Sequence, residues 1–398
     1  YDVPVMYFPK FFHPDPSVKR KSGFLIPSIK NSTDSTNYFS IPYFSVISQN
    51  KDFTFTPRLY SNSDFLFQTE YRQKNKDSSH ISDFSMFNEK NNTKSHFFYK
   101  YNKFVQFANF DEENINLKIE KSSNDTYLRK SKLSSPLFRN LNVLENTLGM
   151  RLSTDKISLD TELKVYEDLD KEKNSDRYEF ILPKFDITKK IDNFTNFAGN
   201  FLLKSNNLIR SYDTNILEKV NVNNLIFSSD LSISDAGFQN DYEFIIKNVN
   251  SDTENSSNYK QNENFYLSGL FQYNSSLPMV KKSSEFTNIF KPKLALKISP
   301  NYTKDISKDE GNRLDVDNIF NLDRLSANEV LEGGISLTLG NDFSIFDKNS
   351  KEIFGFKLAN NLRLEENDDL PRRNQLNSKN SNFFGEILFN PNDLIRTK

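Results

Sequence analysis

The sequence contains no cysteine and no tryptophan, and its 398 residues include only three histidines. Without cysteine, no disulfide can form within the chain and no thiolate metal site can be built. His13, His80 and His96 show neither the close pairing of zinc ligands nor the partner spacing of a catalytic triad. We expect His13 in a proline turn and the other two in or beside polar loops. We therefore predict no catalytic residues, no metal and no cofactor.

Long apolar runs and a charge imbalance are also missing. No stretch of about 18 apolar residues occurs, which excludes a transmembrane helix. The 52 basic and 53 acidic residues nearly cancel, so no nucleic-acid partner is predicted. The 11 glycines form no phosphate-binding loop. The stretch "DVDN", Asp315–Asn318, lacks the glycine and closing glutamate of a calcium loop, and we expect a solvated turn there.

Aromatic residues, by contrast, are abundant: 38 Phe and 17 Tyr lie among Asn, Ser, Lys and Asp. This content argues against disorder. Apolar and polar residues alternate from end to end. In "DKISLDTELKVYEDL", for example, Leu159 and Leu163 share one face and Ser158 lies on the other. A period of two predicts strands with one apolar and one polar face.

Long polar stretches separate the predicted strands, such as "EKSSNDTYLRKSKLSS" and "TKDISKDEGNRLDVDN". Long loops on one side and short turns on the other are typical of an outer-membrane barrel. Alternation alone does not separate such a barrel from a soluble β-sandwich. The clustering of aromatic residues near strand ends, as in "SHFFYKYNKF", favours the barrel. The predicted fold is therefore all-β, a large antiparallel transmembrane β-barrel.

Several phrases near the start of the chain stand out. They are an apolar phrase, a proline turn, a basic run leading to "SGFLIP", an aromatic strand, a "TPRLY" phrase and "QTEYRQ". These are Pro4–Tyr7, Pro14–Pro16, Lys19–Lys21, Ser22–Pro27, Ser40–Val46, Lys51–Ser61 and Gln68–Gln73. Together, in this order, they resemble the LptD family of lipopolysaccharide-assembly proteins.

Two segments near the other end, Leu314–Gly340 and Asp368–Ile387, resemble later parts of the same family. Ser326–Ala327 stand where the family usually has a glycine, so this loop is expected to differ in shape. Between roughly Lys74 and Ser284 the alternation continues with few family phrases.

The resemblance implies a fold, a location and partners. It implies an outer-membrane barrel preceded by a periplasmic jellyroll, in the bacterial cell outer membrane. Residues 1–21 are expected to be the end of the jellyroll and the linker, and residues 22–398 the barrel, incomplete at its C-terminal end. The chain opens within an apolar phrase without Met, and we expect it to be a fragment of a longer precursor. Implied partners are lipopolysaccharide, an LptE-like plug lipoprotein, and an LptA-like periplasmic bridge reached through the missing jellyroll.

Two prolines, Pro27 and Pro42, fall in the first two predicted strands, Gly23–Ile29 and Tyr38–Val46. Proline has no N–H for a β-ladder and is normally confined to edges or bulges. In the family these strands lie at the seam with the last strand. The resemblance therefore implies a lateral gate weakened by the two prolines. The alternative is a bulge or strand-start proline without a gating role.

Two further sets are candidates for a lipopolysaccharide path. Lys19, Arg20 and Lys21 form a basic run that suits either lipid phosphates or simple interfacial anchoring. Val5 and Tyr7 belong to the apolar opening, which resembles the last jellyroll strand; the alternative is plain jellyroll core.

The predicted function is a lipopolysaccharide translocon that delivers its substrate to the outer leaflet without bond chemistry. The alternatives are a general outer-membrane porin or another barrel, including an outer-membrane enzyme, which would need a Ser/His/Asp set facing the lumen or rim. A soluble β-sandwich is the least favoured.

Overall fold

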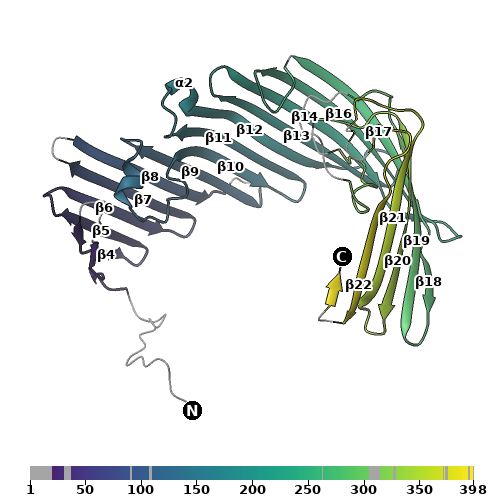
Figure 1. Ribbon diagram of the computed structural model, residues 1–398, viewed down its shortest axis with the longest axis horizontal. Coiled ribbons are helices and arrows are strands. Elements are labelled where there is room, and N and C mark those ends of the chain that lie inside the picture. Colours follow the sequence, from purple (N-terminus) through teal and green to yellow (C-terminus); the bar gives the residue numbers. More distant parts are fainter. Residues whose placement is uncertain are drawn as a thin grey trace, which may run out of the picture. The chain divides into compact units, whose positions relative to one another are not determined.

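The computed structural model describes residues 20–30, 37–89, 92–106, 110–261, 263–303, 314–325, 329–370, 372, 375–392 and 395–397. Nearly all of its regular structure is antiparallel β (Figure 1), which confirms the predicted all-β class. No helix among the described residues is long and apolar enough to cross a membrane. Of the predicted jellyroll tail, only Arg20 and Lys21 fall within the described residues.

The chain divides into two compact units. The first comprises residues up to 105, 114–148 and 166–172, and the second comprises 106–113, 149–165 and 173–398. Three strands, β9 (Glu112–Ser122), β10 (Val143–Ser153) and β11 (Ile157–Asp168), contribute residues to both units. The predicted boundary at residue 21 is a different division, and it stays a prediction.

The first unit is a run of antiparallel strands with one short helix. Its elements are β1 (Gly23–Phe24), β2 (Ser28–Lys30), β3 (Tyr38–Ser40), β4 (Tyr43–Ser48), β5 (Lys51–Tyr60), β6 (Phe65–Lys74), β7 (Ser78–Glu89), β8 (Asn92–Phe104), β9 (Glu112–Ser122) and α1 (Tyr127–Ser131). Strand β1 pairs with β4, β2 with β3, and both β3 and β4 with β5. From β5 to β9 each strand pairs with the next one along the chain.

The second unit continues the same up-and-down order. Its elements are α2 (Asn174–Arg177), β12 (Tyr178–Ile191), β13 (Gly199–Tyr212), β14 (Ile216–Ser229), β15 (Ser232–Ile233), β16 (Gln239–Glu254), β17 (Asn264–Ser276), β18 (Met279–Lys282), β19 (Phe286–Ile298), β20 (Ile335–Asp347), β21 (Glu352–Arg363), β22 (Phe384–Asn392) and β23 (Ile395–Thr397). The pairs run β12–β13–β14–β16–β17–β19–β20–β21–β22–β23, with β15 on β16 and β18 on β19.

Connections in the second unit differ in length at the two ends of the strands. Residues 299–334 join β19 to β20 and residues 364–383 join β21 to β22 at one end. The short turn 213–215 lies at that same end, where Asp213 and Asn215 take positive φ, a conformation that Asp and Asn tolerate better than most residues. At the opposite end, residues 348–351 suffice between β20 and β21. The longest connections thus gather at one end, as predicted for an outer-membrane barrel.

Each unit has a covered face and a bare face. We call the connection 123–142 the first covering segment, and the described residues of the connection 299–334, namely 299–303, 314–325 and 329–334, the second covering segment. Each packs against one face of its own unit, the covered face. Along β19, Ala295 and Lys297 point to the covered face and are buried, whereas Ile298 is 44% exposed. Along this part of β19 the charged Lys297 therefore lies under the protein's own chain, and the apolar Ile298 lies bare.

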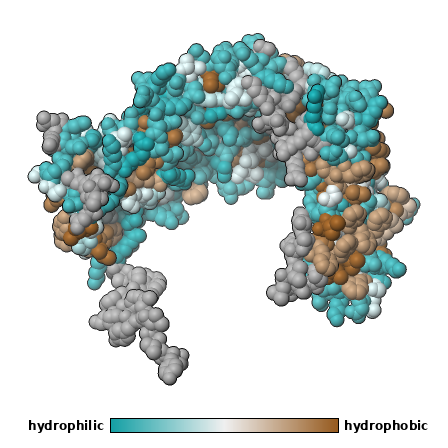
Figure 2. Space-filling model, in the orientation of Figure 1, coloured by the Kyte–Doolittle hydropathy of each residue, from teal (hydrophilic) through white to brown (hydrophobic). Residues whose placement is uncertain are grey.

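The bare face carries much of the exposed apolar surface. In the first unit it includes Phe84 and Phe97, and in the second unit Phe265, Leu267 and Leu339. Figure 2 shows hydrophobic side chains gathered over the lower half of β18–β22. A soluble sandwich would bury these residues and expose the polar ones. The reverse arrangement is what a sheet in contact with lipid requires.

Candidate functional site

The two prolines predicted as a gate lie in the two facing breaks of the first hairpin, residues 25–27 and 41–42. Pro27 falls between β1 and β2, and Pro42 falls between β3 and β4. The prediction of two continuous strands, Gly23–Ile29 and Tyr38–Val46, is therefore wrong: each is split in two. At the break the backbone N–H of Leu25 donates to the carbonyl of Pro42 at 2.8 Å. Because neither proline can donate, the ladder is interrupted at the same level on both sides.

The outer half of this hairpin, β1 and β2, is a bare strand edge. Within the described residues its strand partners are β4 and β3 alone. Its apolar side chains are strongly exposed: Phe24 is 76%, Ile26 89% and Ile29 73% accessible. An unpaired edge with apolar side chains is a template for pairing with another strand.

The basic run next to this hairpin is partly neutralised. Arg20 Nη1 lies 2.5 Å from Asp52 Oδ2, and Arg72 Nε lies 2.7 Å from the other oxygen of Asp52. Two guanidinium groups thus share one carboxylate, and Arg72 Nε also lies 3.4 Å from Glu70 Oε1, so the two arginines are balanced by two carboxylates. Lys21 is exposed. Lys19, Val5 and Tyr7 lie outside the described residues.

A hydrogen-bonded chain lies beneath the first covering segment. Ser85 Oγ lies 2.6 Å from the hydroxyl of Tyr127 in α1 and 2.5 Å from His96 Nδ1, and His96 Nε2 lies 2.9 Å from Asp83 Oδ1. Gln68 Nε2 donates to the same carboxylate at 2.9 Å and to the carbonyl of Ser134 at 3.0 Å. Every member is satisfied if Tyr127 donates to Ser85, Ser85 to His96, and His96 to Asp83.

These contacts correct the expectation for His96, which lies inside β8 and is buried. His80 is the third residue of β7 and lies beside the polar connection 75–77, as expected. Ser85, His96 and Asp83 also lie in the order of a hydrolase triad. Ser85 is completely buried, however, and Tyr127 occupies its hydroxyl, so a substrate has no route to it. The set is better explained as the polar part of a packed core that includes Leu66, Phe98 and Leu128.

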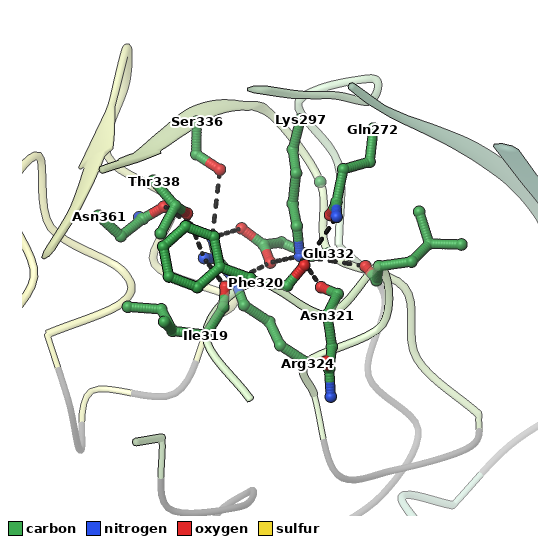
Figure 3. A network of polar contacts seen from close by, with 12 residues as sticks. Gln272, Lys297, Ile319, Phe320, Asn321, Arg324, Glu332, Ser336, Thr338 and Asn361 are labelled. Atoms are coloured by element: carbon green, nitrogen blue, oxygen red, sulfur yellow. Dashed lines mark hydrogen bonds and ion pairs between the residues drawn. The ribbon is translucent and has the colours of Figure 1, made fainter. Parts of the chain in front are cut away.

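An ion network lies beneath the second covering segment, and Glu332 is its centre (Figure 3). Arg324 binds Glu332 with two parallel contacts of 2.6 Å, one to each carboxylate oxygen. Arg363 of β21 lies 2.6 Å from Oε1 of Glu332 and donates to the carbonyl of Gly333. The side chains of all three charged residues are at most 3% exposed. Parallel guanidinium–carboxylate contacts are among the strongest in proteins.

Two lysines of the sheet also support this segment. Lys297 donates to the carbonyls of Asn321 at 2.5 Å and Leu322 at 3.1 Å, and its Nζ lies 3.8 Å from Glu332. Lys247 donates to Asp323 at 2.8 Å and to the carbonyl of Val330 at 2.9 Å. Three strands, β16, β19 and β21, therefore each present a buried cation to the segment. Neutral side chains add four more contacts, from Gln272, Ser336, Thr338 and Asn361.

The cations determine the ionisation of Glu332. Burial by itself would raise the pKa of this carboxyl, but Arg324 and Lys297 outweigh it and lower the pKa well below the usual range. Glu332 is therefore ionised at every physiological pH. The two following glycines allow the turn: a Cβ on Gly333 would lie 2.4 Å from the carbonyl oxygen of Tyr302, and Gly334 has a φ of +89°.

The stretch Asp315–Asn318 of the second covering segment forms a turn, as predicted. Asp315 Oδ1 accepts from the backbone N–H groups of Asp317 at 2.9 Å and Asn318 at 2.8 Å. A carboxylate used in this way holds a turn together. Among the described residues, no group of three or more His, Asp and Glu side chains is arranged to hold a metal ion.

The sequence did not reveal either buried network. Leu314–Gly340 stood out through its family phrases, but nothing in its spacing shows that Arg324 and Glu332 meet Lys297 or Arg363. An available signal was a lysine inside an otherwise small or apolar strand pattern, as at Lys297 in "KLALKIS". His96 could have been placed by its position within the alternation of "SHFFYKY".

Comparison with known proteins adds to this geometry. The family model "LptD: LPS transport system D" matches residues 94–398, which include the second covering segment and all the strands of the second unit. The resemblance recognised in the sequence is thereby confirmed.

Individual relatives carry the same name. An LPS-assembly protein LptD of Shewanella oneidensis is 42% identical over 71 residues, covering 18% of this chain and 9% of the relative. One of Pseudoalteromonas atlantica is 25% identical over 211 residues, covering 50% of this chain and 27% of the relative. One of Nitrosomonas eutropha is 38% identical over 71 residues, covering 18% and 10%. The chain thus spans less than a third of the length of these curated relatives.

Proposed function

Because the chain belongs to the LptD family, we propose that it forms part of an outer-membrane translocon for lipopolysaccharide, with a lateral gate at its first strands. The single observation that carries the gate is the first hairpin, where Pro27 and Pro42 interrupt the ladder at the same level. In lipid, every backbone N–H and C=O must be paired. A seam with fewer donors therefore opens at lower cost than a fully paired one.

The surroundings of the hairpin suit this role. The bare edge of β1 and β2 provides a surface on which a closing strand can pair and part. The exposed Phe24, Ile26 and Ile29 suit acyl chains. The exposed Lys21 leaves positive charge beside the hairpin, where lipid phosphates would pass, whereas Arg20 and Arg72 are balanced by Asp52 and Glu70. An LptE-like plug and an LptA-like bridge follow from the family resemblance alone.

This function is favoured over an outer-membrane enzyme. The Ser85–His96–Asp83 set is the strongest catalytic candidate among the described residues, and its serine is fully buried. A general porin would need no doubly interrupted hairpin at its first strands.

The test is the double substitution Pro27→Ala with Pro42→Ala in the full-length protein. Each alanine supplies a backbone donor, worth about 0.5–1.5 kcal/mol per bond formed. We expect slower appearance of newly made lipopolysaccharide at the cell surface together with a higher unfolding temperature. Pro57→Ala, in the neighbouring strand β5, is the matched control and should leave export unchanged. Normal export with a lowered unfolding temperature would refute the gate.

A further inference from the structure

The bare face of strands β13, β14, β16 and β17 is graded along the strands. Register places the following residues side by side in rows. The first row is Phe201, Phe227, Phe244 and Phe271; the second is Leu203, Leu225, Ile246 and Gly269; the third is Ser205, Asn223, Asn248 and Leu267; and the fourth is Asn207, Asn221, Asn250 and Phe265. Aromatic and aliphatic rows thus give way to amides within six residues, or about 20 Å.

The amides form a connected surface. Asn223 donates to Asn221 at 2.7 Å and to Asn248 at 3.2 Å, and Asn250 donates to Asn248 at 2.8 Å. Beyond them, Lys219 and Asp252 form an ion pair of 2.8 Å. Each amide carries two donor hydrogens and an acceptor oxygen, so the rows hold one another in place and present both kinds of group outward.

A cavity of about 570 Å³ opens over the fourth row. Its lining includes Asn207, Asn221, Asn250, Asp252 and Phe265. Phe265 is 69% exposed at its edge. The site is an open, shallow depression, so it would contact one side of a bound molecule.

This lining matches one class of ligand. Sugar hydroxyls both donate and accept, which amides and carboxylates satisfy, and the apolar face of a sugar ring packs on an exposed aromatic ring. A phosphate would instead need unpaired cations. Here Lys219 is already paired with Asp252, and Glu263 adds a further negative charge to the lining.

We propose that this cavity binds a sugar of a membrane glycolipid, with the acyl chains lying along the aliphatic and aromatic rows. The position of this site supports a membrane lipid as the source of the sugar. The amide rows lie at the end of the strands that carries the long connections, which in outer-membrane barrels is the extracellular end. For this orientation the inference rests on the proposed function.

The experiment uses the full-length protein in detergent. The probe is the oligosaccharide released from lipopolysaccharide of the host bacterium, and binding is measured by calorimetry. Phe265→Ala and Asn250→Leu should each weaken binding about tenfold, the loss of one packed or hydrogen-bonded contact. Leu267→Ala, two residues along β17 on the same face, is the matched control and should bind as the unchanged protein does.

A second arm of the experiment distinguishes an intact membrane lipid from a free oligosaccharide as the source of the sugar. Intact lipopolysaccharide in mixed micelles should bind more tightly than the oligosaccharide and show the same loss in Phe265→Ala. Binding of the intact lipid alone, weakened equally by Leu267→Ala and Phe265→Ala, would mean acyl contact only and would overturn the sugar site. Failure of the unchanged protein to bind either probe would also overturn it.

A third arm tests the orientation separately. Since the chain has no cysteine, Glu263→Cys adds a thiol to it at a known place. A membrane-impermeant maleimide should label this variant, above the unchanged protein, on whole cells. Absence of labelling, with labelling restored after lysis, would refute the orientation in the proposed function. Labelling without sugar binding would refute only the site.

Discussion

The two units cover their polar faces in the same way but with different chemistry. In each, a long connection folds back over the sheet and buries polar side chains. Beneath the first covering segment, Tyr127, Ser85 and His96 form a chain of single hydrogen bonds that ends on Asp83. Beneath the second, Glu332 is held by two arginines, with Lys297 nearby. In the first arrangement each hydrogen bond is modest, so the loss of one member is tolerated. In the second, several buried cations depend on one carboxylate.

The difference shows what each segment requires to stay in place. Hydrophobic packing carries the first segment, since Tyr127, Leu128, Leu133 and Leu137 are all buried in one cluster. In the second segment Leu331 belongs to a hydrophobic cluster formed mainly by the sheet. The segment also supplies carbonyl and carboxylate partners to cations that would otherwise be buried without partners.

The largest expected effect follows from removing the central carboxylate. Glu332→Gln leaves Arg324 and Arg363 buried without a counter-charge, which typically costs about 3–5 kcal/mol. We expect a correspondingly lower urea midpoint for the full-length protein. Glu366→Gln, an exposed change in the neighbouring connection, is the control. A loss of only about 1–3 kcal/mol, the cost of removing one buried hydrogen-bond partner, would show that the two segments are held alike.

A smaller effect is expected in the first unit. Ser85→Ala removes the link between Tyr127 and His96 and leaves two buried polar atoms without their partner, at a cost of about 1–3 kcal/mol. The double variant with Tyr127→Phe should be less destabilised than the two single losses combined, because both remove the same bond. Urea unfolding of the three variants measures this. Strict additivity would contradict the hydrogen-bonded chain.

The two segments should also respond to opposite extremes of pH, with the smallest effects. The pKa of Glu332 is lowered, so its stabilisation is present above about pH 4.3, the usual value for Glu, and is lost as the pH falls below it. Burial raises the pKa of Tyr127 to about 12, so its contribution is complete below pH 10 and is lost as the pH rises from 10 through 12.

Urea midpoints measured across both pH ranges check this prediction. Glu332→Gln should remove part of the acid dependence and leave the alkaline arm unchanged, and Tyr127→Phe should do the reverse. Equal acid dependence in the unchanged protein and in Glu332→Gln would contradict the role of the carboxylate.

The alternation in the sequence was enough to predict the strands and their faces. Leu294, Leu296 and Ile298 lie on the bare face and Lys297 on the covered one, because a strand has only two sides. The connections were not predictable in the same way. Arg324 contacts Glu332 and Asn361 from a connection whose sequence has no periodic pattern. His96 was misplaced because the polar residues before it, Lys94 and Ser95, suggested a loop, whereas its ring packs on Phe98 and on the distant Phe138. The breaks in the strands at Pro27 and Pro42 were not predictable either. Each short strand ends where its pairing with the opposite strand ends, and the sequence alone does not show that pairing.

The graded rows on the bare face also bear on how the strands find their pairing during assembly. A slip of one residue between β14 and β16 would turn every side chain to the wrong face and would be rejected at once. A slip of two residues keeps the faces correct and is the error a uniform apolar surface would permit. Here a two-residue slip sets Asn223 against Ile246 in one direction, and Leu225 against Asn248 in the other. Either slip breaks the hydrogen bonds between the amides. It also places an asparagine among aliphatic side chains at the level of the lipid. The rows therefore encode the vertical alignment of neighbouring strands, in addition to their sidedness.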